Sequence, residues 1–255
     1  MSTFEQLKTE AQRIADVKYT AAVLNWDMEI NMPANGVEAR SRQLATLSGI
    51  AFEMGTSEKF STLLQAAKDD TSLDALQKRN VELLWSDFQK AKKFSQEFVE
   101  EMSMTVSQTF AAWEHAKKAN DFSLYAPQLE KMIALKRKQA EIIGYEKHPY
   151  DALLDDYEPG MTAAVLDEYF NTVRSGLKPL LEKIKAQPQV DNSCLHQHFD
   201  RQQQWDYSIA ILKQMGYDFG AGRQDISTHP FTTNFAATDV RVTTRINEND
   251  MTDCL

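Results

Sequence analysis

Residues 72–119 read SLDALQKRNVELLWSDFQKAKKFSQEFVEEMSMTVSQTFAAWEHAKKA and contain neither proline nor glycine. The apolar residues of this stretch mostly recur every three or four positions, and Lys, Glu, Gln and Asp fill the other side. This spacing is typical of an amphipathic helix. One unbroken helix would be roughly 70 Å long at the rise per residue of an α-helix, which is long for a compact domain. We therefore expect a kink or a break within it.

The same helical spacing continues on both sides of this stretch. Ser2 or Thr3 can cap the first predicted helix, and Pro33 prevents its continuation. Pro179 should bend or interrupt a later helix, and residues 145–160 are expected to be irregular. The chain has only nine glycines and seven prolines, which favours long regular elements with few tight turns. Outside 72–119, the predicted helices cover residues 4–28, 37–54, 57–68, 125–143, 162–186 and 195–215.

The apolar period changes to two near the end of the sequence. Residues 231–235 and 239–246 are predicted strands. One face of the second strand carries Val240, Val242, Thr244 and Ile246, and the other carries Asp239, Arg241, Thr243 and Arg245. A two-stranded ribbon is marginally stable alone, and no closing element follows it, so we expect a truncated sequence. The predicted fold class is mainly α, with long amphipathic helices and a short β-ribbon near the C-terminus.

Composition excludes several classes of function. The 37 acidic and 28 basic side chains give a net charge of −9, which argues against binding to nucleic-acid phosphates. No run of eighteen apolar residues and no secretory signal are found, so no membrane association is expected. Cys194 and Cys254 are far apart and cannot build a disulfide framework or a four-thiolate zinc site. A cytoplasmic location is the expectation.

The histidines do not form a recognisable metal site. A helical zinc motif places two histidines four residues apart so that both rings project from one face. His196 and His198 are only two apart, and His115 is expected to be exposed on a helix. No Ser or Cys lies in a nucleophile motif such as GxSxG. The sequence therefore offers no catalytic residue and no metal ligand of its own.

Two short segments near the predicted strands are candidates for binding. His229, Pro230 and Phe231 lie in a loop that enters the first strand, where proline stiffens the backbone. Local sequence alone favours a simple turn with a packed aromatic ring. The polar residues of 239–243 suit a solvent-facing edge strand equally well. On a strand that lines a cleft, Arg241 could bind a carboxylate in bidentate fashion.

These segments carry a family resemblance. His-Pro-Phe at 229–231, followed by Asp-x-Arg-x-Thr at 239–243, resembles the signature pair of the carboxypeptidase Taq family of metallocarboxypeptidases. Each motif is weak alone, but their order and spacing are specific, and the resemblance spans essentially the whole chain. Other stretches similar to the family are Trp26-Asp27, Met32-Pro33, Gly36, Arg40, Tyr-Asp-Ala-Leu-Leu-Asp at 150–155 and Glu-Pro-Gly at 158–160.

The resemblance implies a larger, saddle-like helical fold with a small sheet beside the active site. Family members release single residues from peptide C-termini with a zinc or cobalt ion and are commonly homodimers. A His-Glu-x-x-His helix and a later glutamate hold that ion, and the helix follows the Asp-x-Arg-x-Thr strand. Both elements are absent here, since the sequence stops at Leu255. We therefore expect residues 1–255 to be the N-terminal portion of one such domain, truncated before the metal-binding helix and inactive alone.

The resemblance also implies roles for the candidate residues. His229 and Phe231 would contact substrate, while Arg241 would bind the peptide carboxylate or hold Asp239 in place. A structural pair of Arg241 with Asp239 or with a glutamate is an equally good interpretation. The alternative function is a non-catalytic helical scaffold descended from such an enzyme. The predicted substrate-binding residues are His229, Pro230, Phe231, Asp239, Arg241 and Thr243.

Overall fold

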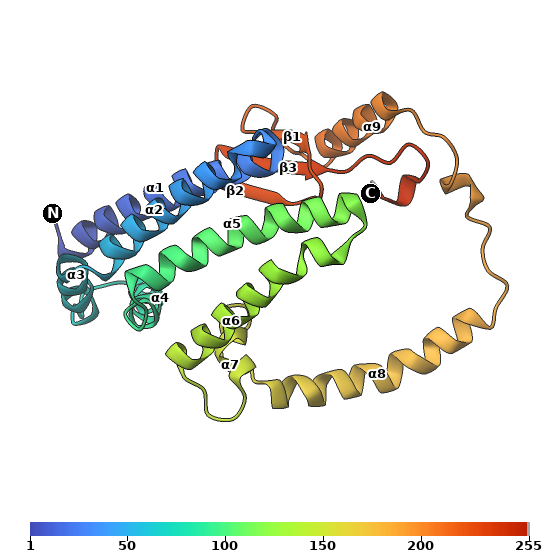
Figure 1. Ribbon diagram of the computed structural model, residues 1–255. Helices are drawn as coiled ribbons and strands as arrows, with labels where there is room; N and C mark the ends of the chain where they lie inside the picture. The colour runs from blue at the N-terminus through green and yellow to red at the C-terminus, as the bar shows by residue number, and fades with distance from the viewer. Residues whose placement is uncertain (254–255) are drawn as a thin grey trace. The chain divides into compact units, whose positions relative to one another are not determined.

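The structure is a computed structural model in which residues 1–253 are described (Figure 1). The chain forms two compact units, Met1–Tyr157 and Glu158–Leu255. In the first unit the regular elements of the described chain are all helical. They are α1 (Thr3–Ile30), α2 (Val37–Thr56), α3 (Glu58–Lys68), α4 (Ala75–Ala91), α5 (Gln96–Ala119), α6 (Ala126–Ile143) and α7 (Pro149–Leu154), with short 3-10 turns at Ala34–Gly36 and Phe122–Leu124.

Side-chain caps fix where these helices begin. The Ser2 hydroxyl accepts a hydrogen bond from the Glu5 amide at the start of α1, which confirms the predicted cap. The expected break within 72–119 lies between α4 and α5. Asp74 begins α4 with a complete capping box, and the Ser95 hydroxyl accepts from the Phe98 amide to begin α5.

The core of the first unit lies where α1, α3 and α4 meet. Leu7 and Leu64 expose no surface there, and the Phe60 and Phe88 rings pack with their centroids 6.2 Å apart. Helix α2 packs against both α1 and α5. At Gly49 of α2 a Cβ atom would meet the Glu100 side chain of α5, so that carboxylate lies directly over the glycine. The buried cluster comprises Leu7, Ile14, Phe60, Leu64, Ala67, Leu73, Val81 and Phe88.

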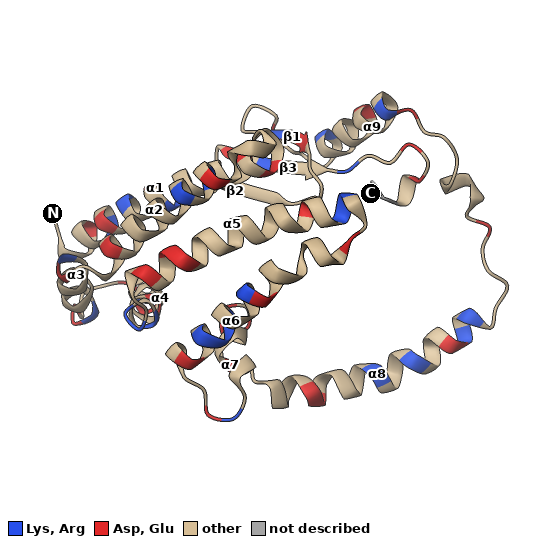
Figure 2. Ribbon diagram, viewed as in Figure 1, with Lys and Arg blue, Asp and Glu red and all other residues tan. Residues whose placement is uncertain are grey.

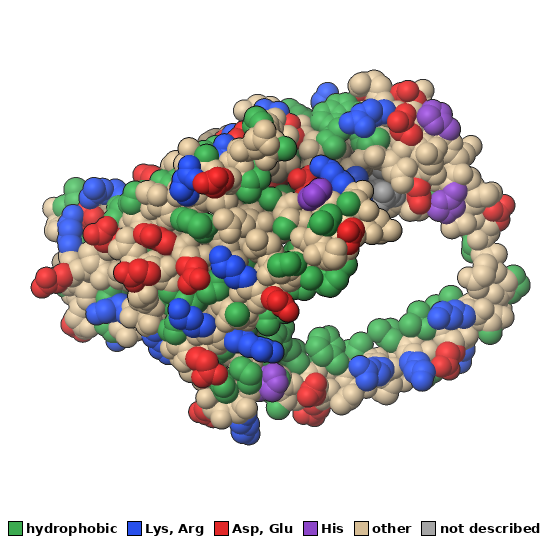
Figure 3. All heavy atoms as spheres, viewed as in Figure 1, with side chains coloured by type: hydrophobic (Ala, Val, Ile, Leu, Met, Phe, Trp, Pro, Cys, Tyr) green, Lys and Arg blue, Asp and Glu red, His purple; other side chains and the backbone are tan. Residues whose placement is uncertain are grey.

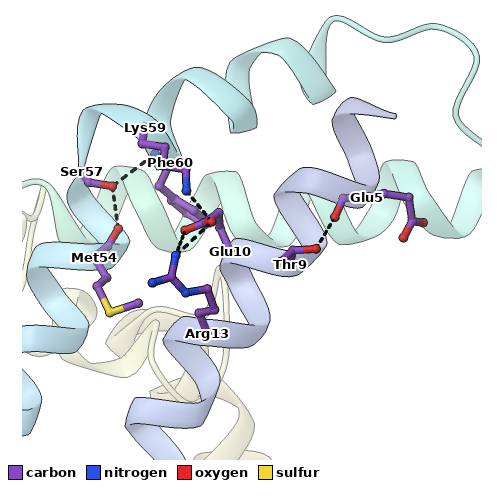
Figure 4. A network of polar contacts seen from close by, with 8 residues as sticks. All are labelled: Glu5, Thr9, Glu10, Arg13, Met54, Ser57, Lys59 and Phe60. Atoms are coloured by element: carbon purple, nitrogen blue, oxygen red, sulfur yellow. Dashed lines mark hydrogen bonds and ion pairs between the residues drawn. The ribbon is translucent and has the colours of Figure 1, made fainter. Parts of the chain in front are cut away.

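A polar network closes the end of this core, as Figure 4 shows. The Glu10 carboxylate of α1 accepts hydrogen bonds from Lys59 of α3 and from Arg13 one turn along α1. The bond from Lys59 holds the pKa of Glu10 below its ordinary value. Ser57 caps α3 and donates to the Met54 carbonyl oxygen, so it joins the end of α2 to the start of α3.

Three residues of the family-like stretches in the first unit, Asp27, Arg40 and Asp155, make contacts between elements. Arg40 of α2 donates to the carbonyl oxygen of Leu24 and, at 2.6 Å, to the Asp27 carboxylate, so it joins α2 to α1. Lys90 of α4 bridges the carboxylates of Asp155 and Asp156, which follow α7. Burial alone would lower the pKa of Lys90, but the two carboxylates outweigh burial and raise it.

Within its described residues, 158–253, the second unit contains two α-helices, a small sheet and short 3-10 turns at Ser193–Leu195 and Met251–Asp253. The helices are α8 (Ala163–Lys185) and α9 (Arg201–Gln214), and the strands are β1 (Gly222–Ile226), β2 (Thr232–Ala236) and β3 (Asp239–Thr244). The strand order is β1-β3-β2, with β3 parallel to β1 and antiparallel to β2. The mainly helical fold class is confirmed, and the expected two-stranded ribbon is instead a three-stranded sheet.

Further differences from the sequence-based expectations have local causes. Residues 145–160 are not wholly irregular, because His148 caps α7 and Pro149 occupies its first turn. Helix α9 begins at residue 201 rather than at the predicted residue 195. The Asp200 carboxylate caps this start by accepting hydrogen bonds from the Gln202 and Gln203 amides. Pro179 lies inside α8 without interrupting it. Cys254 lies outside the described residues.

None of the helices within residues 1–253 combines the length and the apolar character that crossing a bilayer requires. Acidic and basic residues are distributed along the helices of both units, as Figure 2 shows.

Candidate functional site

The candidate site is built on the central strand of the sheet, β3. Its neighbour β1 approaches closely at Gly222, which is paired with Val240. A Cβ atom on Gly222 would collide with the Tyr217 hydroxyl and with the Val240 carbonyl oxygen. That hydroxyl is hydrogen-bonded to the Val240 carbonyl oxygen and lies 3.2 Å from the Arg223 carbonyl oxygen. Glycine at this position thus allows one tyrosine to hold both strands together.

The loop 227–231, between β1 and β2, is fixed by one hydroxyl of β3. Thr243 Oγ1 accepts a hydrogen bond from the Phe231 amide at 2.7 Å and lies 3.1 Å from the Phe231 carbonyl oxygen. The Thr243 amide also donates to that carbonyl at 2.9 Å. Buried Ser227 lies 2.8 Å from Thr243 Oγ1 and 2.9 Å from the His229 carbonyl oxygen. The two motifs predicted to form one site are therefore in direct contact.

The loop presents its residues differently to solvent. His229 and Pro230 are exposed, whereas Phe231 is half-buried at the start of β2. The contacts through Thr243 and Ser227 hold the backbone of this loop at His229 and Phe231, so His229 stands on a fixed backbone rather than in a loose turn. Sequence inspection predicted His229, Pro230, Phe231 and Thr243 but not Ser227, which lies only two residues before the histidine.

Arg241 and Asp239 form a bidentate ion pair on β3. Arg241 Nε and Nη2 donate to the two carboxylate oxygens of Asp239 at 2.9 and 3.0 Å. The guanidinium carbon lies 4.9 Å from the centroid of the Phe235 ring of β2. The Arg241 hydrogen bonds lower the pKa of Asp239 below its ordinary value. Of the arrangements that the sequence left open, the structure thus contains the Arg241–Asp239 pair.

A second pair of the same type lies on β1. Arg223 is the register partner of Arg241 in the parallel pairing, and its Nε donates to the Asp225 carboxylate at 2.7 Å. Arg223 is the more exposed arginine, at 56% of its side-chain surface against 18% for Arg241. These residues were not predicted, because a sequence such as Gly-Arg-Gln-Asp-Ile lacks the apolar alternation of a strand. The Arg-x-Asp spacing, the reverse of Asp239-x-Arg241, is the signal that could have indicated them.

The described residues do not provide a metal site. Within residues 1–253, no three His, Cys, Asp or Glu side chains are grouped so that they could hold one ion together. His196 lies 3.5 Å from the Asp250 carboxylate, but this contact is a pair and not a cluster. A metal ion therefore does not fit the residues present in this part of the chain.

Comparison with known proteins agrees with these motifs. The family model described as carboxypeptidase Taq (M32) metallopeptidase matches residues 6–255. The chain belongs to this family. Carboxypeptidase Taq relatives include thermostable carboxypeptidase 1 of Pyrococcus furiosus, which is 36% identical over 251 residues, or 97% of this chain and 50% of the relative. Carboxypeptidase 1 of Bacillus subtilis is 36% identical over 243 residues, or 94% of this chain and 48% of the relative.

A solved carboxypeptidase structure has the same fold as this chain. The crystal structure of BsuCP matches 99% of the chain with a TM-score of 0.96 and 33% sequence identity, and the match covers 51% of that structure. The family resemblance inferred from the motifs is confirmed. The chain also spans about half the length of the relatives it matches.

Proposed function

We propose that this chain is the N-terminal half of a metal-dependent carboxypeptidase that releases single amino acids from peptide C-termini, and that it is inactive alone. Membership of the family supports the reaction class. The match to only about half the length of each relative supports the proposal that this chain is one half of such an enzyme. In the complete enzyme, zinc or cobalt would be held by residues outside this sequence. A homodimer and a cytoplasmic location are further predictions, which rest on the family resemblance and on the sequence.

Residues of this chain would position the peptide. The observation that carries this proposal is the attachment of the His-Pro-Phe loop to β3 through Thr243. Through this attachment, the loop that carries exposed His229 is held against β3, the strand that carries Arg241. We assign His229 and Phe231 to substrate contact, and Arg241 to the recognition of the terminal carboxylate. Asp239 would orient the guanidinium through its bidentate bonds.

The role of Arg241 is tested in the complete enzyme. Arg241→Ala should lower kcat/KM about 10- to 100-fold for a peptide with a free C-terminus, because a charged hydrogen bond to the substrate is lost. A C-terminally amidated peptide should be affected much less. Arg223→Ala is the matched control, since it removes the neighbouring, more exposed guanidinium. Equal losses on both peptides would assign Arg241 a structural role instead.

The division of the enzyme is tested directly. Purified 1–255 should release no C-terminal amino acids in the presence of Zn²⁺ or Co²⁺, because metal-assisted hydrolysis needs a bound ion and a carboxylate that moves a proton. Tight stoichiometric metal binding with peptide hydrolysis would contradict the proposal. Sequencing the gene beyond codon 255 should show a His-Glu-x-x-His helix, in frame or after one frameshift.

A second candidate is a non-catalytic scaffold. One observation favours it, namely that α8 has no buried residue within the described chain and could serve a partner protein. A natural stop codon with no metal-binding helix downstream would support the scaffold and would contradict the enzyme.

A further inference from the structure

Helix α8 carries a continuous apolar face. None of its residues is buried in the described chain. Figure 3 shows hydrophobic side chains gathered along this helix. Seven large apolar residues, each exposing 51–60% of its surface, form what we term the α8 stripe. The α8 stripe consists of Val165, Tyr169, Phe170, Leu177, Leu180, Leu181 and Ile184.

The spacing of these residues places them on one side of the helix. At about 100° per residue they fall within one half of the helical circumference. The opposite side carries polar residues, among them Asn171, Ser175 and Glu182. All seven side chains are at least half exposed and share one side of the helix, so the α8 stripe is a contiguous apolar patch rather than a set of scattered surface residues. Such a surface indicates a docking site.

We propose that the α8 stripe is the docking surface for the half of the fold that the relatives possess and this sequence does not include. The inference rests on the proposed function. The relatives are about twice as long as the matched region. The BsuCP structure matches 99% of this chain, including at least most of α8, and holds about as much chain again. An absent segment of that size, joined to this chain in one fold, can cover the stripe.

Two other partners for the α8 stripe, a membrane surface and a second copy of this chain, are less well supported by the same observations. A membrane surface attracts helices with a strongly basic polar side, but α8 carries three acidic residues beside its four basic ones, so its polar side is mixed in charge. A second copy could pair antiparallel, because Asp167 and Glu168 lie in the second turn of α8 and Lys183 and Lys185 in its last turn. Self-pairing through the stripe would nevertheless leave the missing half to pack elsewhere.

The test uses the chain 1–255 with an affinity tag. The probe is the half of Bacillus subtilis carboxypeptidase 1 that lies outside the matched region, expressed in the same cells. The two polypeptides should purify together in a 1:1 complex. Amide hydrogen exchange in α8 should be at least tenfold slower in the complex than in 1–255 alone, because the helix is then covered.

Substitutions in α8 identify the surface. Leu177→Glu with Leu180→Glu places two charges at the centre of the α8 stripe and should lower the yield of complex at least tenfold. Asn171→Glu with Ser175→Glu adds the same charge on the opposite side and should leave the yield unchanged. Circular dichroism should show equal helicity for both variants. Leu177→Ala with Leu180→Ala, which preserves helix propensity, should give an intermediate loss.

Other outcomes would overturn the inference. No co-purification, or equal losses for the stripe and control variants, would contradict it. A dimer of 1–255 that the stripe variant separates, without capture of the probe, would assign the surface to a second copy. Binding to anionic phospholipid vesicles without capture would assign it to a membrane. Docking without peptidase activity would contradict the proposed function alone, whereas activity with rapidly exchanging α8 amides would contradict docking alone.

Discussion

Helices α3 and α8 are both amphipathic, but their apolar residues have opposite surroundings. In α3, Phe60, Leu64 and Ala67 are almost fully buried against α1 and α4. In α8, residues of the same type, such as Leu177 and Leu180, expose half of their surface. The pattern of a helix therefore indicates which side needs a partner, but not whether that partner lies in the same stretch of chain.

The largest effect is expected in the buried cluster. Leu64→Ala should lower the free energy of unfolding of the first unit by about 3 kcal/mol, because it leaves a cavity at a fully buried position. Trp85 packs against this cluster, so its fluorescence should report unfolding by urea. A loss under 1 kcal/mol would show that the cluster is loosely packed and would weaken the contrast with α8.

A smaller effect is expected where α1 and α2 are joined by charge. Arg40→Ala should cost about 1.5 kcal/mol, because it removes hydrogen bonds to the Leu24 carbonyl and to Asp27 at a site where the arginine side chain is 14% exposed. Arg42→Ala removes an exposed pair with Glu38 on the same helix and should cost only a few tenths of a kcal/mol. Urea unfolding of both variants measures the difference, and equal losses would contradict the role of Arg40.

Replacing the half-buried carboxylate of Glu29 should raise the free energy of unfolding, unlike the substitutions above, and the gain should depend on pH. Burial raises the pKa of Glu29, and the charge of Glu114 adds to the rise, while a hydrogen bond from Asn25 opposes it. The folded state therefore binds the proton more tightly than the unfolded state, and ionisation lowers stability above the raised pKa. Glu29→Gln should stabilise the protein by about 0.5 kcal/mol near neutral pH.

This gain should disappear as the pH falls through the raised pKa of Glu29, because the wild-type side chain is then neutral as well. Thermal unfolding near pH 7 and near pH 4 checks the sign. Glu168→Gln in exposed α8 is the control and should leave stability unchanged at both values. A gain for Glu29→Gln that is as large in acid would exclude ionisation as its cause.

The smallest effect is expected on α8 itself. Leu177→Ala should change the free energy of unfolding of 1–255 by less than about 0.5 kcal/mol, because the side chain is half-exposed and alanine favours a helix. Urea unfolding followed by circular dichroism measures this change. A loss above 1 kcal/mol would show that α8 is already covered in this chain and would remove the contrast with α3.

Local signals predicted most of the helices. The cap at Ser2 and the uninterrupted apolar spacing of α1 are short-range features, so they can be read from the sequence. The break within 72–119 was expected, but its position between α4 and α5 was not identified. Strand β1 was missed because it contains a single large aliphatic residue, Ile226, and depends on its long-range pairing with β3.

The candidate site was only partly predictable. The order and spacing of the motifs predicted that His229, Phe231, Arg241 and Thr243 belong to one site. The hydrogen bonds that join loop and strand depend on the fold, since Thr243 Oγ1 reaches the Phe231 backbone from twelve residues away. Ser227 carried no signal of its own. The choice of Asp239 as the partner of Arg241 likewise required coordinates, because the sequence allowed a glutamate as well.

The strand order has a consequence for synthesis on the ribosome. The middle strand of the sheet, β3, is the last of the three to be translated, and β1 and β2 each pair with it rather than with one another. Until residues 239–244 have left the exit tunnel, neither earlier strand has its partner in this sheet. The loop that carries His229 must therefore acquire its final shape late, when the Thr243 hydroxyl becomes available to it.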